Sequence, residues 1–118
     1  MASVAEKVRS KGQGLLGTWV KIPSFETVQL IAHAGFEFVV IDMEHAPHSL
    51  DRAVELVFCA QATGMSALVR PPDQLGSTIQ PLLDGGADGL LVPRVADPSV
   101  ADEITRRMVF APKGERGL

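Results

Sequence analysis

The chain has 118 residues, of which 46% are hydrophobic and 21% charged, and its formal net charge is −3 at pH 7. This length suits one domain with a substantial core, and the composition excludes a disordered chain. The acidic balance gives no electrostatic reason to expect a nucleic-acid or anionic-membrane partner.

Three further features narrow the class of protein. No apolar run approaches the ~20 residues of a membrane span, and residues 1–12 lack the continuous apolar core of a secretory signal. The single cysteine, Cys59, excludes an internal disulfide and a cysteine-based zinc site. It lies in an apolar helical pattern, which predicts a buried, inert thiol. We expect a cytoplasmic protein with no membrane partner.

Apolar runs and capping residues predict a short amino-terminal helix and then four strands, each followed by a helix. The predicted strands cover 15–20, 36–42, 67–70 and 89–92, and the predicted helices cover 3–11, 25–34, 50–63, about 79–84 and 98–108. Ser24, Ser49 and Asp97 are the expected N-caps, with Pro98 at the first helical position of the last helix. In the helix after Ser49, the residues expected to face inward are Leu50, Ala53, Val54, Val57 and Phe58.

Three glycines near the amino terminus match a dinucleotide-binding pattern. Gly12, Gly14 and Gly17 fit Gly-x-Gly-x-x-Gly, but that fingerprint requires a strand before it and a helix after it. Here the order is reversed, so we discount the match. Gly17 instead allows close backbone approach in the first strand.

Strands that alternate with helices predict right-handed βαβ units and a parallel sheet, the α/β class. The period of roughly 25 to 30 residues fits either part of a βα barrel or a small doubly wound sheet. In both folds the chemistry lies at the carboxyl ends of the strands.

Ionisable side chains cluster at one predicted strand end. The buried strand 36–42 ends in Asp42, and Glu44 and His45 follow directly. Arg70 ends the next strand, so the four side chains are expected at one face. A polar strand end that only reaches solvent is the alternative. For Arg70, a structural ion pair with Asp42 or Glu44 is the alternative to a substrate contact.

Five segments together carry a family resemblance: Gly17-Thr18-Trp19, AGFEFVVIDMEHAP at 34–47, LVRPP at 68–72, LLDGGADGLLVPRV at 82–95 and PKGERG at 112–117. In this order and spacing the chain resembles the HpcH/HpaI family of 2-oxo-acid aldolases, which are metal-dependent pyruvate aldolases with a TIM-barrel fold.

The resemblance implies a (β/α)8 barrel of which residues 1–118 form the amino-terminal half, comprising an amino-terminal helix and four βα units. It implies an aldehyde-lyase that cleaves 4-hydroxy-2-oxo acids, such as 4-hydroxy-2-oxoheptanedioate, to pyruvate and an aldehyde in aromatic compound catabolism. A divalent metal (Mg²⁺, Mn²⁺ or Co²⁺) would be held by a Glu and an Asp of strands five and six, outside this chain. The family also implies a homo-oligomer, a hexamer.

The resemblance assigns roles to the clustered residues. His45 would be the base that removes the 4-hydroxyl proton, and Arg70 would grip the oxo acid and stabilise enolate charge. Asp42 and Glu44 would contact the substrate or a metal-bound water. Asp84 would pair with His45 and fix its tautomer. The fold places Asp84 at the opposite end of the same barrel, so a neighbouring subunit would supply it, unless its use is local and structural.

The last loop and the open edges of the sheet lead to two further expectations. Lys113 and Arg116 either help to bind an anionic substrate or are ordinary surface charges. With both sheet edges open, Val40, Leu68 and Leu91 are expected to meet water, so the isolated chain would self-associate or be only marginally folded. Because the implied metal ligands lie outside it, it would show no metal-stimulated aldolase activity. A non-catalytic half-barrel that acts only by association is the alternative function. A citrate-lyase β type enzyme acting on acyl-CoA fits the IDMEHAP and LVRPP segments less well.

Overall fold

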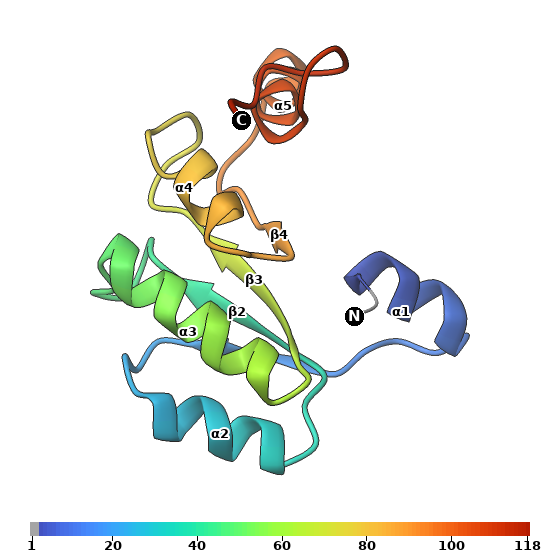
Figure 1. The fold of residues 1–118 in the computed structure, drawn as a ribbon, viewed down its shortest axis with the longest axis vertical. Coiled ribbons are helices and arrows are strands. Elements are labelled where there is room, and N and C mark those ends of the chain that lie inside the picture. Colours follow the sequence, from blue (N-terminus) through green and yellow to red (C-terminus); the bar gives the residue numbers. More distant parts are fainter. Residues whose placement is uncertain (1–2) are drawn as a thin grey trace.

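The computed structural model describes residues 3–118, in which four parallel strands alternate with helices (Figure 1). The strands are β1 (Gly17–Val20), β2 (Phe38–Asp42), β3 (Ser66–Arg70) and β4 (Gly89–Leu90), and the helices are α1 (Val4–Lys11), α2 (Phe25–His33), α3 (Leu50–Ala62), α4 (Ile79–Asp84) and α5 (Pro98–Met108). The sheet order is β1-β2-β3-β4 and every pairing is parallel. The α/β class and the order of elements predicted from the sequence are confirmed.

The predicted N-caps hold the starts of three helices. The side chains of Ser24 and Ser49 accept hydrogen bonds from backbone N–H groups three residues on, at 3.2 and 3.3 Å. Asp97 accepts from the N–H of Ser99 at 2.9 Å, with Pro98 in the first turn. Each such cap is worth about 1 kcal/mol. The sequence signals for helix starts are therefore confirmed.

Three strands are shorter than predicted, and the reasons are local. β1 and β2 each begin about two residues later than predicted. Just before them, the N–H of Leu16 donates to the side chain of Glu37 at 2.9 Å, while the N–H of Glu37 donates to the carbonyl of Leu16 at 2.8 Å. At β4, the N–H of Leu91 still donates to the carbonyl of Val69 at 2.9 Å. Pro93 then ends the strand because it has no N–H to donate.

The core lies between the sheet and the helices that cover one of its faces (Figure 1). Alternate strand residues point into it, and they are packed against the inward stripes of α2, α3 and α4: Val39, Ile41, Ala67 and Val69 from the strands, with Val28, Leu56, Val57 and Leu82 from the helices. The prediction that Phe58 faces inward is wrong, because its side chain is 73% exposed. The buried stripe of α3 follows helical spacing through 53, 56, 57 and 60, and Phe58 lies just outside it.

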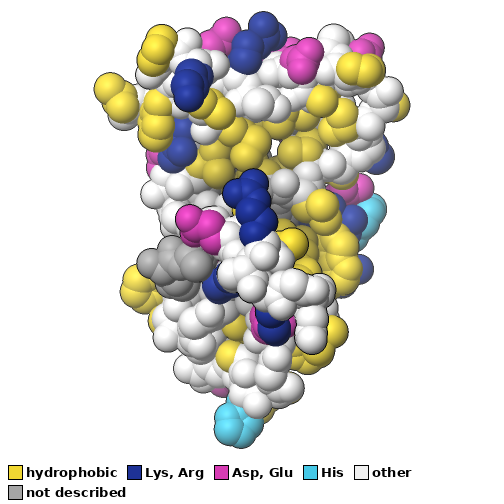
Figure 2. All heavy atoms as spheres, turned by 90° about the vertical axis from the view of Figure 1, so that its right-hand side faces the viewer, with side chains coloured by type: hydrophobic (Ala, Val, Ile, Leu, Met, Phe, Trp, Pro, Cys, Tyr) yellow, Lys and Arg dark blue, Asp and Glu magenta, His cyan; other side chains and the backbone are white. Residues whose placement is uncertain are grey.

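The other face of the sheet is a shallow apolar hollow of about 380 Å³, lined by Gly17, Thr18, Trp19, Phe38, Val40, Leu68 and Leu91. Figure 2 shows the side of the molecule beneath α5 where hydrophobic side chains gather in a hollow. Trp19 and Leu91 are exposed, but the expectation that Val40 meets water is wrong: it is 6% exposed. It lies in register between Trp19 and Leu68, whose larger side chains flank it.

Two smaller expectations are also tested by the packing. A Cβ on Gly17 would lie 2.2 Å from the Phe38 ring, so the expected close approach is confirmed. Cys59 is partly buried, and burial raises the pKa of its thiol, which fits an inert side chain. Within residues 3–118, none of the helices combines the length and apolar character needed to cross a bilayer.

Candidate active site

The carboxyl ends of the strands bring several ionisable side chains to one edge of the sheet. Asp42 and Arg70 are the last residues of β2 and β3 and are paired in register. Glu44 and His45 follow in the loop before α3. The structure thus brings together the four residues that the sequence placed at one face. This is the edge at which parallel α/β folds assemble their sites.

Asp42 is the buried centre of this group. Its side chain has no exposed surface, and its two oxygens accept hydrogen bonds from Nε and Nη2 of Arg70 at 3.0 and 2.7 Å. Its Oδ1 also accepts the backbone N–H groups of Glu44 and His45 at 3.0 and 3.1 Å. Burial by itself would raise the pKa of Asp42, but the Arg70 hydrogen bonds and these two N–H groups outweigh it and lower the pKa to about 2. Asp42 is therefore a fixed anion that shapes the loop carrying His45.

The guanidinium of Arg70 is held by Trp19 and Asp42, and Glu44 lies slightly farther away. Its guanidinium lies over the Trp19 ring, 4.2 Å from the ring centroid, and its bidentate pair with Asp42 raises the pKa of Arg70. The nearest Glu44 oxygen is 3.9 Å from Nε, so Asp42 is the partner that orients the fork. The ion pair considered from the sequence is present. Because Asp42 takes Nε and one terminal nitrogen, the other terminal nitrogen remains for a ligand.

Glu44 connects the cluster to the next strand. Its side chain is only 11% exposed, with Oε1 3.0 Å from Nε2 of His45 and 3.8 Å from Nε of Arg94. Its Oε2 is buried and has no hydrogen-bond partner among the described residues. A buried carboxylate oxygen in that state is costly to keep.

His45 is the accessible member of the cluster. Its side chain is 59% exposed, and one ring nitrogen is held by Glu44. An imidazole that is both anchored and accessible suits proton transfer to or from a bound molecule. The other two histidines differ: His48 is buried and its Nε2 lies 3.1 Å from the carbonyl oxygen of Val20, and His33 is exposed at the end of α2. His48 is therefore a structural residue, and His33 faces solvent.

Asp84 is not near His45 in this chain. It ends α4, which runs antiparallel to the strands and so carries Asp84 to their amino-terminal side. There its Oδ1 accepts a 2.7 Å bond from Arg116, whose guanidinium also lies over Phe110. Arg116 is thereby held away from the cluster. A role for Asp84 beside His45 would need a second copy of the chain, and it stays a prediction.

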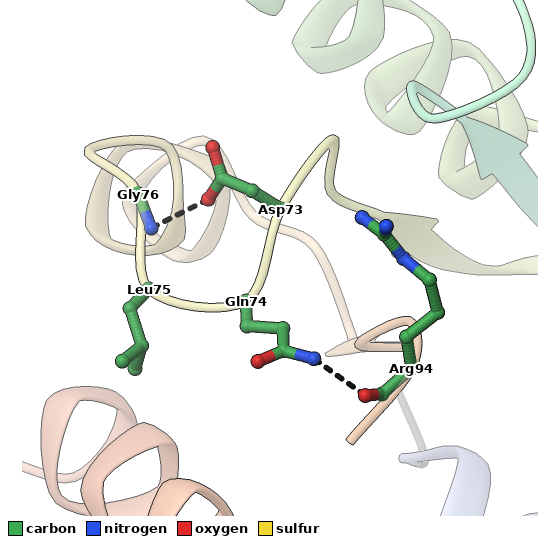
Figure 3. A pocket seen from close by; sticks show the side chains of 5 residues that line it. All are labelled: Asp73, Gln74, Leu75, Gly76 and Arg94. Carbon is green, nitrogen blue, oxygen red and sulfur yellow. Dashed lines mark hydrogen bonds between the residues drawn. The ribbon is translucent and has the colours of Figure 1, made fainter. Parts of the chain in front are cut away.

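A hollow of about 710 Å³ opens beside the cluster, between the loop after β3 and the end of β4. Its lining residues are Asp73, Gln74, Leu75, Gly76 and Arg94 (Figure 3). Gln74 joins the two loops, because its Nε2 donates to the carbonyls of Pro93 and Arg94 at 3.1 and 2.6 Å. The carboxylate of Asp73 is directed to the N–H of Gly76 at 2.6 Å.

Across residues 3–118, no group of three or more His, Cys, Asp or Glu side chains is arranged to hold a metal ion. Both oxygens of Asp42 already accept hydrogen bonds from Arg70. Glu44 has one oxygen without a hydrogen-bond partner among the described residues, and that oxygen is buried. The side chains of residues 3–118 do not by themselves fit a divalent metal. The expectation that its ligands lie elsewhere stays a prediction.

Three further residues at this edge of the sheet were not predicted from the sequence to be site residues. Lys21 follows β1, with Nζ 3.8 Å from Oδ2 of Asp42. Trp19 supplies the ring under Arg70, and Arg94 follows β4. Lys21 and Arg94 carry the same signal that singled out Glu44, a charged residue just beyond a strand. The stacking of Trp19 on Arg70 has no sequence signal, because it depends on the register of β1 against β2.

Parallel βα units with an ionisable cluster at the carboxyl edge of the sheet are typical of α/β enzymes. The model of one family, described as HpcH/HpaI aldolase/citrate lyase, matches residues 15–118. The chain belongs to the HpcH/HpaI aldolase/citrate lyase family, as the resemblance indicated.

Named relatives agree with this assignment. A hydroxypyruvate/pyruvate aldolase of Roseobacter denitrificans is 31% identical over 96% of this chain and 44% of its own length. A 4-hydroxy-2-oxo-heptane-1,7-dioate aldolase of Escherichia coli is 33% identical over 91% of this chain and 41% of its own. The crystal structure of an HpcH/HpaI aldolase from Desulfitobacterium hafniense superposes with a TM-score of 0.89 at 33% identity, covering 99% of this chain and 46% of that one. The chain spans less than half the length of these relatives.

Proposed function

We propose that residues 1–118 are the amino-terminal half of a metal-dependent class II aldolase barrel that cleaves 4-hydroxy-2-oxo acids to pyruvate and an aldehyde. The observation that carries the proposal is the anchored, accessible imidazole of His45 beside the Asp42–Arg70 pair. A base and a fixed guanidinium at one edge are what retro-aldol cleavage requires. Family membership and the relatives' names support the same reaction class.

The proposed chemistry assigns one step to each side chain. His45 takes the proton of the 4-hydroxyl group, the C3–C4 bond breaks, and the oxygen at C4 becomes the aldehyde carbonyl. The electron pair of the broken bond passes into the enolate of pyruvate. Arg70 contacts the negative charge of that enolate through its remaining guanidinium N–H groups. Protonation of the enolate at C3 then gives pyruvate.

Other parts of the proposal concern groups beyond this cluster. A divalent metal, with ligands outside these residues, would supply Lewis-acid stabilisation of the enolate. Asp42 orients Arg70 and the His45 loop, and Glu44 holds the imidazole and contributes its open oxygen to substrate binding. A homo-oligomer would place Asp84 of one copy beside His45 of the next.

A matched pair of histidine variants tests the base. In the protein as encoded in full by its gene, His45→Ala should lower kcat for pyruvate release by roughly 10²–10⁴, the usual contribution of general-base catalysis. His33→Ala is the control, because His33 is exposed at the end of α2 and is not part of the cluster. Release is followed by coupling pyruvate to lactate dehydrogenase. Wild-type turnover in His45→Ala would remove His45 from the mechanism.

Mixing inactive variants tests the role of Asp84. If Asp84 acts in a neighbouring copy, co-refolding His45→Ala with Asp84→Ala should restore activity, because mixed pairs contain one site with both residues intact. Equal inactivity of the mixture and of each variant alone would show that Asp84 does not act in a neighbouring copy.

A further inference from the structure

The loop that carries His45 lies between two buried polar side chains. In residues 3–118 the polar or charged residues that are buried are Asp42, His48 and Ser66. Ser66 begins β3, whereas Asp42 ends β2 and His48 lies just before α3. His45 stands midway between Asp42 and His48 in the sequence. Asp42 holds the first part of this loop through two backbone N–H groups, so the role of His48 at the other end is the open question.

The ring of His48 ties the loop to β1. Its Nε2 lies 3.1 Å from the carbonyl oxygen of Val20, which is the last residue of β1 and is fully buried. Because a carbonyl oxygen only accepts hydrogen bonds, Nε2 carries the proton and is the donor. The cap formed by Ser49 is local, since it binds an N–H group of α3 itself. His48 is thus the side chain that joins this end of the loop to the sheet.

The second ring nitrogen shows what the histidine costs at this position. Nδ1 of His48 is buried and has no hydrogen-bond partner in the described part of the chain. A buried nitrogen in that state is unfavourable, and an apolar side chain of similar size would avoid the penalty. The hydrogen bond from Nε2 to Val20 is the contact that distinguishes a histidine here from an apolar residue.

The tether ends beside two residues that contact the cluster. Val20 is flanked by Trp19 and Lys21. The guanidinium of Arg70 lies 4.2 Å from the centroid of the Trp19 ring, and Nζ of Lys21 lies 3.8 Å from a carboxylate oxygen of the buried aspartate. A loop held to the backbone at this point is therefore held in a fixed relation to Arg70 as well.

We propose that His48 is a positioning residue, whose hydrogen bond to Val20 fixes the loop so that the imidazole of His45 is placed correctly relative to Arg70. Its effect on turnover rests on the proposed function. The side chain of His45 is 59% exposed and is held at its ring by Glu44, so its place depends on the backbone of the loop. A displacement of about 1 Å at a reacting group can cost roughly 10²-fold in rate. His48 is buried and acts through the loop.

Two amides of different length test the tether in the protein as encoded in full. Glutamine places its amide nitrogen as far from Cβ as Nε2 of histidine, whereas asparagine falls short of Val20. His48→Asn should therefore lower kcat for pyruvate release roughly ten- to a hundredfold, with KM changed less than about threefold, and His48→Gln should recover most of the loss. His48→Leu fills the site without an unpaired amide and should behave as His48→Asn does.

The matched control is His33→Asn, which makes the same change at an exposed histidine at the end of α2 and should leave kcat unchanged. Wild-type kcat in both His48→Asn and His48→Leu overturns the proposal. A loss of kcat that His48→Gln does not recover also overturns it, because the side chain would then serve only by its packing. If His48→Asn does not fold, His48→Leu provides the comparison with His48→Gln.

A measurement without substrate separates failure of this inference from failure of the proposed function. The Cε1 ring signal of His45 is recorded by carbon NMR in histidine-labelled protein and is assigned by its loss in His45→Ala. His48→Asn and His48→Leu should shift this signal, and His48→Gln should return it toward the wild-type position. Glutamine also lacks the ring, so a shift caused only by loss of the ring would remain in that variant. If the wild type releases no pyruvate, the proposed function fails, and this signal still decides on His48. An unchanged signal, or the same shift in all three variants, overturns the role of His48.

Discussion

Replacing Asp42 with asparagine should destabilise the chain in a pH-dependent way. Asp42 has no exposed surface and its carboxylate receives four hydrogen bonds, two of them from Arg70. Its pKa falls from 3.8 to about 2 in the folded chain. At about 1.36 kcal/mol per pK unit, this corresponds to about 2.4 kcal/mol of stability at pH 7. Asp42→Asn also leaves Arg70 without its anion, so we expect a loss of about 2–4 kcal/mol.

The sign of the pH dependence follows from the lowered pKa. A carboxylate with a depressed pKa stabilises the fold fully above its unfolded pKa, and this stability is lost as the pH falls from about 4 toward 2. The gap between the wild type and Asp42→Asn should therefore be large at pH 7 and shrink by pH 2.5.

Urea unfolding at both pH values measures this gap. Circular dichroism reports the whole fold, and fluorescence of the single tryptophan, Trp19, reports the environment of Arg70. Asp102→Asn, at an exposed position of α5, is the control for removing one negative charge. A loss below about 0.5 kcal/mol at pH 7, or a gap that does not change with pH, would refute the account of the Asp42–Arg70 pair.

Further expectations concern Arg70, the core and the isolated chain. Arg70→Lys should raise KM and slow pyruvate enolisation, because the lysine lacks the bidentate fork; unchanged values in hydrogen–deuterium exchange of pyruvate would make Arg70 purely structural. Leu56→Ala should cost about 2–5 kcal/mol in urea unfolding, since Leu56 is fully buried, while Phe58→Ser should change stability by less than about 0.5 kcal/mol. The 118-residue chain alone should self-associate in sedimentation and release no pyruvate with added Mg²⁺, Mn²⁺ or Co²⁺; a stable monomer with metal-dependent turnover would contradict this.

The sequence predicted most of the fold because its signals are local. Ser24, Ser49 and Asp97 satisfy helix N–H groups within three residues, so capping is visible in the sequence itself. Strand ends and inward helix faces were less well predicted. Phe58 sits one residue beyond the buried stripe of α3, and only packing against the sheet decides on which side of that boundary it falls.

Only part of the site was predicted, because only some of its contacts follow from the order of the strands. Asp42 and Arg70 meet because β2 and β3 are adjacent and in register, which the alternating pattern implies. The stacking of Arg70 on Trp19 and the bridging of two loops by Gln74 are long-range contacts without a sequence pattern.

Pyruvate release from 4-hydroxy-2-oxoheptanedioate by the protein encoded in full tests the central claim most directly. The account predicts release that is lost after treatment with EDTA and restored by Mg²⁺, Mn²⁺ or Co²⁺, because the metal would stabilise the enolate. Absence of pyruvate from this and every other 4-hydroxy-2-oxo acid would contradict the assignment as an aldolase. Release that EDTA does not change would contradict the dependence on a metal.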